Sequence, residues 1–153
     1  MPARTDQAMG DEAGLARRAA AGDAAAFTVL VRLHEGAVRR FLQRLARYDG
    51  ADDMAQEVFL KAWRQSGRWR GEGSYRSWLL GIAWTTFLGF HRAGGRRDAR
   101  DQEAAPSLKP GVSDPAARID IARALASLGE RERAAALLCF AEGCSHAEAA
   151  AIL

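Results

Sequence analysis

Cysteine and histidine are scarce in this chain of 153 residues, and their scarcity excludes several kinds of site. Two cysteines, Cys139 and Cys144, cannot build the disulfide framework of a small secreted protein. With His146 they give three candidate ligands, whereas a closed structural zinc site takes four. We therefore expect no metal and no cofactor, and we interpret the cysteines as one core thiol and one turn thiol, both reduced.

Long hydrophobic runs and enzyme motifs are also absent. No stretch approaches the roughly 20 apolar residues that a membrane-spanning helix needs, and the N-terminal segment MPARTDQAMGDEAGLARR has no apolar centre of a signal peptide. The three histidines lie far apart, no glycine-rich phosphate loop follows a strand, and neither cysteine has an evident base partner. These absences predict a cytoplasmic protein that is not an enzyme and does not insert into a membrane.

Hydrophobic residues are plentiful at 48% of the chain, and they recur at helical spacing. A first helix is expected from before Leu15 to about Gly22, and Asp23 has the chemistry to cap a second one. The apolar side of that second helix carries Phe27, Leu30, Val31, His34, Val38, Phe41, Leu42 and Leu45. We interpret His34 on this side as a packed histidine and not as a ligand.

The rest of the chain also indicates helices. One is expected to start at Asp52 or Asp53, and another to run from Ser77 to about residues 94–95. Shorter helices are expected over residues 119–128 and 129–143, with Gly143 as a C-terminal cap, and a last one begins at the capping box SHAE. No segment alternates as a strand does, so the sequence predicts an all-α fold.

Residues 94–115, GGRRDARDQEAAPSLKPGVSDP, hold all but one of the prolines and little that could pack. This composition predicts a flexible linker. The expected organisation is therefore two small helical domains, residues 10–93 and 116–153. The second ends in a helix, a short turn with Gly and a capped helix, which is the front half of a helix-turn-helix.

The stretch DDMAQEVFLKAWRQSGRWR, residues 52–70, has an unusual helical face. At about 100° per residue, Ala55, Val58, Phe59 and Ala62 form an ordinary core stripe. The opposite face carries four polar residues with an apolar one among them: Asp53, Gln56, Glu57, Arg64 and Leu60. A helix that only covered its own core would not need a leucine there, although a solvated face with one exposed leucine is common in proteins.

Positive charge is concentrated in one part of the chain. The net charge is only +3, but residues 64–100 hold eight arginines against Glu72 and Asp98, interleaved with aromatic residues. Such a pattern is typical of a nucleic-acid surface, because arginine binds phosphates with two hydrogen bonds and stacks on bases. A solvated arginine-rich face explains the charge alone equally well, and composition leaves both interpretations open.

Four blocks in order resemble the bacterial sigma-70 family of transcription initiation factors, in its small extracytoplasmic-function (ECF) subgroup. They are AAGDAAAFTVL, DDMAQEVFLKAW, GSYRSWLLGIAW and LGERERAAALLCFAEGCSHAEAAAIL, and DD-x-x-QEVF-x-x-AW is the most specific part. The resemblance extends from about Leu15 to Leu153. It implies that the chain binds core RNA polymerase and directs recognition and melting of the promoter −10 element, and that an anti-sigma protein covering both lobes is a further partner.

The resemblance also assigns roles to residues. Asp53, Gln56 and Glu57 match positions that dock on the coiled coil of the polymerase β′ subunit, and helical geometry adds Leu60 and Arg64. The segment RWRGEGSYRSWLLGIAW resembles the part that opens promoter DNA, where aromatic rings replace lost base stacking. The DNA-binding candidates are Trp69, Tyr75, Arg76, Trp78, Trp84 and Thr85, with Arg92, Arg96 and Arg97 for phosphates. Fewer than half of the aromatic residues are expected to touch DNA, because Trp78 is expected to pack largely in the core and Trp63 beneath its helix.

Two departures from the family pattern stand out. The usual I-A-R-N appears as Ile82-Ala83-Trp84-Thr85, and Gly89 stands where an Asp is expected a turn later. The family's −35 recognition helix would follow Leu153, so we expect either a fragment or a loss of −35 recognition. The last helix should then pack loosely or bury its Ala147, Ala150, Ala151 and Leu153 face elsewhere. An interaction module that binds polymerase or an anti-sigma factor without directing initiation is the main alternative, ahead of a stand-alone regulator built on the C-terminal helices.

Overall fold

The described part of the protein is entirely helical. The structure is a computed structural model that describes residues 3–46, 50–95, 121 and 123–153, and no strand occurs in these ranges. The elements are α1 (Ala3–Ala20), α2 (Ala24–Leu45), α3 (Ala51–Arg64), the 3₁₀ turn η1 (Ser66–Arg68), α4 (Tyr75–Gly95), α6 (Glu130–Ala136), the π-helical turn η2 (Leu137–Ala141) and α7 (His146–Ile152). The predicted all-α fold is confirmed.

Several helix ends follow the predicted capping chemistry. Asp23 caps α2: its Oδ1 accepts from the Ala26 backbone N–H at 3.0 Å, and its Oδ2 pairs with Arg18 at 2.7 Å. These two donors lower the pKa of the Asp23 carboxyl. Ser145 and Glu148 form the predicted capping box at α7, with backbone-to-side-chain distances of 2.9 and 3.2 Å.

Two boundaries differ from the prediction. Helix α3 starts at Ala51, one residue before Asp52, after Gly50 with a φ of 143° and no side-chain cap. Asp52 instead lies 3.3 Å from Arg39 of α2. The helix expected over residues 129–143 changes to a π turn after Ala136, where the Glu142 N–H donates to the Leu137 carbonyl. Gly143, with a φ of 68°, then ends it as predicted.

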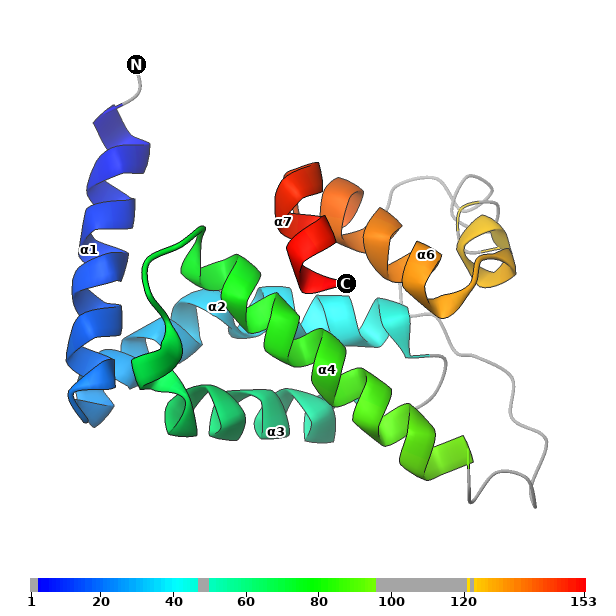
Figure 1. Ribbon diagram of the computed structural model, residues 1–153, viewed down its shortest axis with the longest axis horizontal. Helices are drawn as coiled ribbons and strands as arrows, with labels where there is room; N and C mark the ends of the chain where they lie inside the picture. The colour runs from blue at the N-terminus through cyan, green and yellow to red at the C-terminus, as the bar shows by residue number, and fades with distance from the viewer. Residues whose placement is uncertain (1–2, 47–49, 96–120, 122) are drawn as a thin grey trace.

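The core lies where α2, α3 and α4 pack together (Figure 1). Its largest fully buried side chains come from these three helices and from η2, and include Leu30, Phe41, Leu42, Met54, Val58, Leu79, Phe87 and Leu138. His34 is packed as predicted, with its Nε2 2.5 Å from a carboxylate oxygen of Glu12 on α1. This contact joins α1 to α2.

The C-terminal helices pack on the same core (Figure 1). Ala134, Leu137, Leu138 and Ala149 are buried in one cluster with the core of α2, α3 and α4. Helix α7 packs against α4, with Ala149 buried and Ile152, next to Gly81 of α4, half-buried. Of the face expected to need cover, Ala147, Ala150 and Ala151 are exposed and Leu153 is half-buried.

The remaining sequence expectations concern the linker, the cysteines and membranes. Gly94 and Gly95 end α4, and the rest of the predicted linker lies outside the described residues. Cys139 and Cys144 are free thiols and half-buried, and burial raises the pKa of Cys144. Among the described helices, none is long and apolar enough to cross a bilayer.

Candidate functional site

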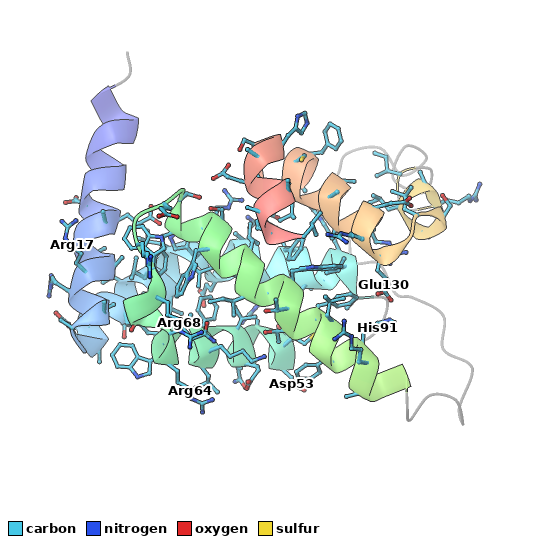
Figure 2. All side chains as sticks on the ribbon, in the orientation of Figure 1. Arg17, Asp53, Arg64, Arg68, His91 and Glu130 are labelled. Atoms are coloured by element: carbon cyan, nitrogen blue, oxygen red, sulfur yellow. The ribbon has the colours of Figure 1, made fainter. Side chains whose placement is uncertain are left out.

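The outer face of α3 brings together the five residues predicted to dock. Asp53, Gln56 and Arg64 are exposed, and Glu57 is partly exposed with a carboxylate oxygen 3.8 Å from Lys61 Nζ. Figure 2 shows Asp53 and Arg64 pointing away from the body of the molecule at opposite ends of the helix. We call these five residues, with Leu60 among them, the docking face.

Leu60 is the unusual member of the docking face. Its side chain is 51% exposed although it lies in the middle of a helix whose Met54, Val58 and Ala62 are buried. Single exposed leucines are common on protein surfaces. An exposed leucine framed by two acids, an amide and an arginine differs, because it offers apolar burial with polar contacts around it.

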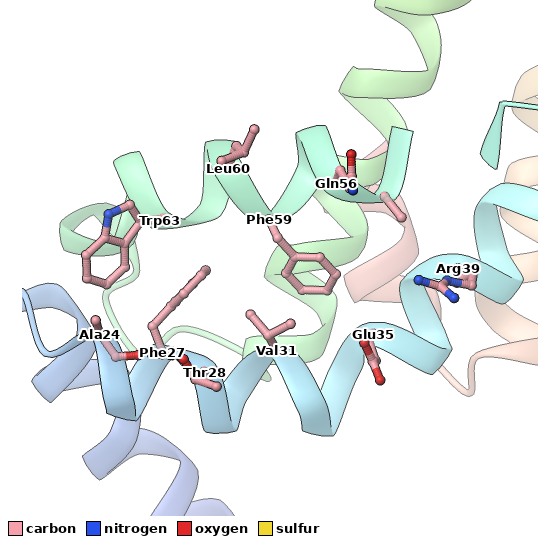
Figure 3. Close-up of a pocket in the computed structure, with 11 residues that line it drawn as sticks. Ala24, Phe27, Thr28, Val31, Glu35, Arg39, Gln56, Phe59, Leu60 and Trp63 are labelled. Atoms are coloured by element: carbon pink, nitrogen blue, oxygen red, sulfur yellow. Dashed lines mark hydrogen bonds between the residues drawn. The ribbon is translucent and has the colours of Figure 1, made fainter. Parts of the chain in front are cut away.

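An apolar groove runs beside the docking face, between α2 and α3, and has a volume of about 570 Å³. Figure 3 shows Phe27, Phe59 and Trp63 pointing into it, and Leu60 and Gln56 of the docking face also line it. The rings of Phe27 and Trp63 are 5.0 Å apart. The sequence placed these aromatic residues on core-facing sides of their helices, and it did not predict the groove because helical spacing within each helix does not determine how closely two helices pack.

The aromatic DNA candidates divide by burial. Trp69 and Trp78 are half-buried, and each ring lies against Tyr75, at 5.5 and 5.2 Å respectively. Tyr75 itself is only 2% exposed, and Trp84 is 4% exposed and stacked on Phe87 at 5.8 Å. The expectation that Tyr75 and Trp84 present their rings to DNA does not fit this arrangement, because both face the core.

The buried ring of Tyr75 has an unusual environment. Among the described residues its hydroxyl has no hydrogen-bond partner. Burial raises the pKa of Tyr75 to about 12, and the carboxylate of Glu12 adds to the rise because a second negative charge nearby disfavours the phenolate. The phenol therefore stays neutral and acts as part of the packing.

The polar DNA candidates are scattered along α4. Thr85 is exposed, and its hydroxyl donates to backbone carbonyls one turn earlier, the nearer being Ile82 O at 3.0 Å. Arg92 is exposed near the end of the helix, and Arg96 and Arg97 lie outside the described residues. Arg76 is half-buried and forms an ion pair with Glu142, a residue that no sequence pattern singles out.

Two further arginines lie next to Trp69 in the sequence. Arg68 and Arg70 flank Trp69 and are exposed, and Figure 2 shows Arg68 in the turn that follows α3. They are two of the eight arginines in residues 64–100, but neither occupies a position of a recognisable sequence motif. Their placement on either side of a half-buried indole gives the cation and ring pairing that single-stranded nucleic acids bind.

Comparisons with known proteins match both parts of the chain. Residues 30–97 match the model of sigma-70 region 2. The ECF RNA polymerase sigma-E factor of Escherichia coli K12 is 31% identical over 155 residues, covering 91% of this chain and 81% of its own length. The factor of the same name from Haemophilus influenzae is 37% identical over 93 residues, which span 61% of this chain and 46% of that protein.

Two solved structures share the fold. The sigma factor RpoE bound to the anti-sigma factor NepR from Bartonella quintana has a TM-score of 0.71 at 28% identity, covering 82% of this chain and 81% of that one. CnrH in complex with the cytosolic domain of CnrY has a TM-score of 0.67 at 25% identity, covering 93% of this chain and 82% of that one.

Proposed function

This chain belongs to the ECF subgroup of the sigma-70 family, and from that membership we propose that it is a transcription initiation factor that binds core RNA polymerase and directs it to promoter DNA. It acts by binding and not by catalysis, and it works in the cytoplasm, where polymerase and DNA are. An anti-sigma protein is a further partner, since both structural relatives were solved with a second protein and one of these is named an anti-sigma factor.

The docking face is proposed to bind the coiled coil of the polymerase β′ subunit. The observation that carries this assignment is the 51% exposure of Leu60 among Asp53, Gln56, Glu57 and Arg64. An apolar centre with a charged rim combines burial with electrostatic selection of a basic partner. The groove formed by Phe27, Phe59 and Trp63 extends this surface toward α2.

A double charge reversal tests the docking face. Asp53→Lys with Glu57→Lys should weaken binding to core polymerase by about tenfold or more, because charges that attract a basic partner become repulsive. The matched control is Asp11→Lys with Glu72→Lys, which makes the same charge change at exposed acids on α1 and in the loop before α4. Circular dichroism should show equal helicity in both variants. If the docking-face variant bound polymerase as tightly as the control variant does, the assignment would be contradicted.

Promoter opening is proposed to use the segment from Arg68 to Arg97. Trp69 and Trp78 supply stacking surfaces, and the buried Tyr75 and Trp84 hold the neighbouring backbone from beneath. Thr85 lies beside the melted strand. The proposed phosphate contacts are Arg68, Arg70, Arg76, Arg92, Arg96 and Arg97.

A run-off transcription assay with core enzyme tests initiation itself. Specific transcripts that depend on this chain support the proposal. Binding to polymerase without transcripts would instead assign the chain to an interaction module that occupies polymerase without directing initiation.

A further inference from the structure

Four rings pack together where α2, α4 and the turn after η1 meet, and we call them the aromatic cluster: His34, Trp69, Tyr75 and Trp78. The centroid of the Tyr75 ring lies 5.7 Å from that of His34, 5.5 Å from that of Trp69 and 5.2 Å from that of Trp78. Because Tyr75 touches the other three rings, its position limits where the Trp69 ring can lie. Trp69 is proposed above to stack on a base, so the residues that hold Tyr75 bear on promoter opening.

The aromatic cluster has a polar anchor at one end. Among the described residues, the Tyr75 hydroxyl and Trp69 Nε1 are buried without a hydrogen-bond partner, so these two rings are held by packing alone. His34 differs, because its Nε2 lies 2.5 Å from a carboxylate oxygen of Glu12. The side chains of His34 and Glu12 are only 11% and 22% exposed. Glu12 therefore fixes the ring that packs on Tyr75.

Glu12 comes from α1, a helix that carries none of the docking or DNA candidates. Helix α1 contacts α2, α4 and η1, the turn that leads to Trp69 (Figure 1). The Ser66 hydroxyl of η1 lies 3.5 Å from the Ala19 carbonyl oxygen at the end of α1. The Glu12 carboxylate is also close enough to Tyr75 to add to the rise in the pKa of its phenol. Helix α1 is thus in contact both with the turn before Trp69 and with the cluster that Trp69 joins.

Loss of the Glu12 carboxylate would leave the buried Nε2 of His34 without its partner, which is costly. The unpaired hydroxyl of the adjacent Tyr75 ring offers a new partner, and the rings must move to reach it. We propose that Glu12 is a positioning residue for promoter opening, which acts through His34 and Tyr75 to hold the Trp69 ring where a base can stack on it. The inference rests on the proposed function and adds to it a residue outside the DNA-binding segment.

The first test follows the Trp69 ring without DNA. In a chain labelled with fluorinated tryptophan, fluorine NMR gives a signal for each of the four tryptophans, and Trp69→Phe identifies that of Trp69. Glu12→Met keeps a long side chain that favours a helix and removes the carboxylate. It should shift or broaden the Trp69 signal and leave unchanged that of Trp84, which stacks on Phe87. Asp11→Met, at the exposed neighbouring residue, is the matched control and should change neither signal.

His34→Phe tests the same path from its other end and does not depend on the folding of Glu12→Met. It keeps a ring against Tyr75 and removes the contact with Glu12, so it should also move the Trp69 signal. Adding Glu12→Met to His34→Phe should cause no further change, because the imidazole through which Glu12 acts is then absent.

Promoter opening is measured with the chain bound to core polymerase, on a promoter that the parent chain transcribes. The permanganate reactivity of unpaired thymines should fall about tenfold for Glu12→Met, which is the order expected when a base loses its stacking partner. Glu12→Gln keeps an oxygen within reach of His34 and should retain opening. Polymerase affinity should equal that of the parent chain for both variants, because the docking face lies on α3 and Glu12 on α1.

The outcomes separate the two proposals. A Trp69 signal that stays in place in Glu12→Met and His34→Phe, or undiminished opening by Glu12→Met, would overturn the positioning role and leave the initiation function standing. An equal loss of opening and of polymerase affinity would also overturn it, because Glu12 would then serve the fold as a whole. Absence of transcripts with the parent chain would overturn initiation, and the fluorine signals would still show whether Glu12 holds Trp69.

Discussion

At the scale of single residues, Tyr75 lies at the centre of an aromatic cluster made by Trp69, Trp78 and His34. Ring centroids of these three residues lie 5.2 to 5.7 Å from that of Tyr75. The phenol joins α2, the turn after η1 and the first turn of α4. Its neutrality matters because a phenolate would have to be buried beside the carboxylate of Glu12.

This environment predicts a late titration. Folded Tyr75 should ionise with a pKa of about 12, against about 10 for a solvent-exposed tyrosine. Because the folded pKa is the higher one, the unfolded chain loses its proton first, so the stability that Tyr75 confers is full below pH ~10 and is lost as the pH rises toward 12. Tyrosinate absorbance measured in a Tyr48→Phe background, which leaves Tyr75 as the one tyrosine, checks this.

Two measurements make the Tyr75 titration decisive. Circular dichroism at each pH shows whether the chain is still folded, since unfolding would itself bring the pKa back to about 10. Glu12→Gln removes the second cause of the shift and should lower the midpoint while leaving it above 10, because burial is the larger cause. A folded protein that titrates near 10 would contradict the burial of Tyr75.

Helical geometry predicted which residues share the docking face, but the sequence did not predict which of the aromatic DNA candidates are buried. The period of 3.6 residues fixes which side chains of α3 share a face, so Asp53, Leu60 and Arg64 lie together as predicted. The DNA candidates followed from the resemblance of residues 68–84 to a DNA-opening segment, and such a resemblance does not determine which rings are buried. Tyr75 and Trp84 therefore lie in the core while Trp69 and Trp78 are partly accessible.

At the scale of elements, the helices are set by local chemistry at their ends. Asp23 at the start of α2 and the Ser145–Glu148 box at α7 satisfy free backbone N–H groups, and both could be read from the sequence. The π turn of η2 could not, because an inserted residue in a helix leaves no mark in the apolar spacing of LLCFA. Its widened turn ends at Glu142, whose burial depends on a residue far away in the chain.

Two glycines in the helical elements should respond oppositely to the same substitution. Gly89 is exposed within α4, and the space that a Cβ would occupy there is open, so Gly89→Ala should stabilise the fold by about 0.5–1 kcal/mol through a smaller loss of backbone entropy. At Gly143 the space for a Cβ is also open, but its φ of 68° lies in the left-handed region that alanine disfavours. Gly143→Ala should therefore destabilise the fold by about 1–2 kcal/mol.

Chemical denaturation of the two glycine variants measures both effects, and each serves as the control for the other. The added methyl group meets no neighbour in either case. A destabilising Gly89→Ala would contradict the helical conformation of residue 89. A neutral Gly143→Ala would show that the turn before α7 does not need the left-handed conformation.

At the scale of the whole molecule, the decisive contacts join distant parts of the sequence. Glu12 meets His34, Lys61 Nζ donates to the Thr86 hydroxyl at 3.1 Å, and Arg76 meets Glu142. Composition predicted a linker over residues 94–115 and hence two domains, residues 10–93 and 116–153. No local pattern states whether these two groups of helices pack together, and in the structure they share one buried cluster.

Leu138→Ala tests whether the shared cluster makes the chain one folding unit. Leu138 is fully buried on η2, and its truncation should destabilise the fold by about 2–5 kcal/mol. All four tryptophans lie between residues 63 and 84, outside the C-terminal helices, so their fluorescence reports on the other part of the core. If the core is continuous, tryptophan fluorescence and circular dichroism should shift together to the same lower midpoint, because unfolding of one part removes the packing of the other.

Leu33→Ala is the control, at a residue 60% exposed on α2. It should change the free energy of unfolding by less than about 0.5 kcal/mol by both probes. A fluorescence midpoint that stays fixed while the dichroism curve splits into two transitions would show that the C-terminal helices form an independent domain.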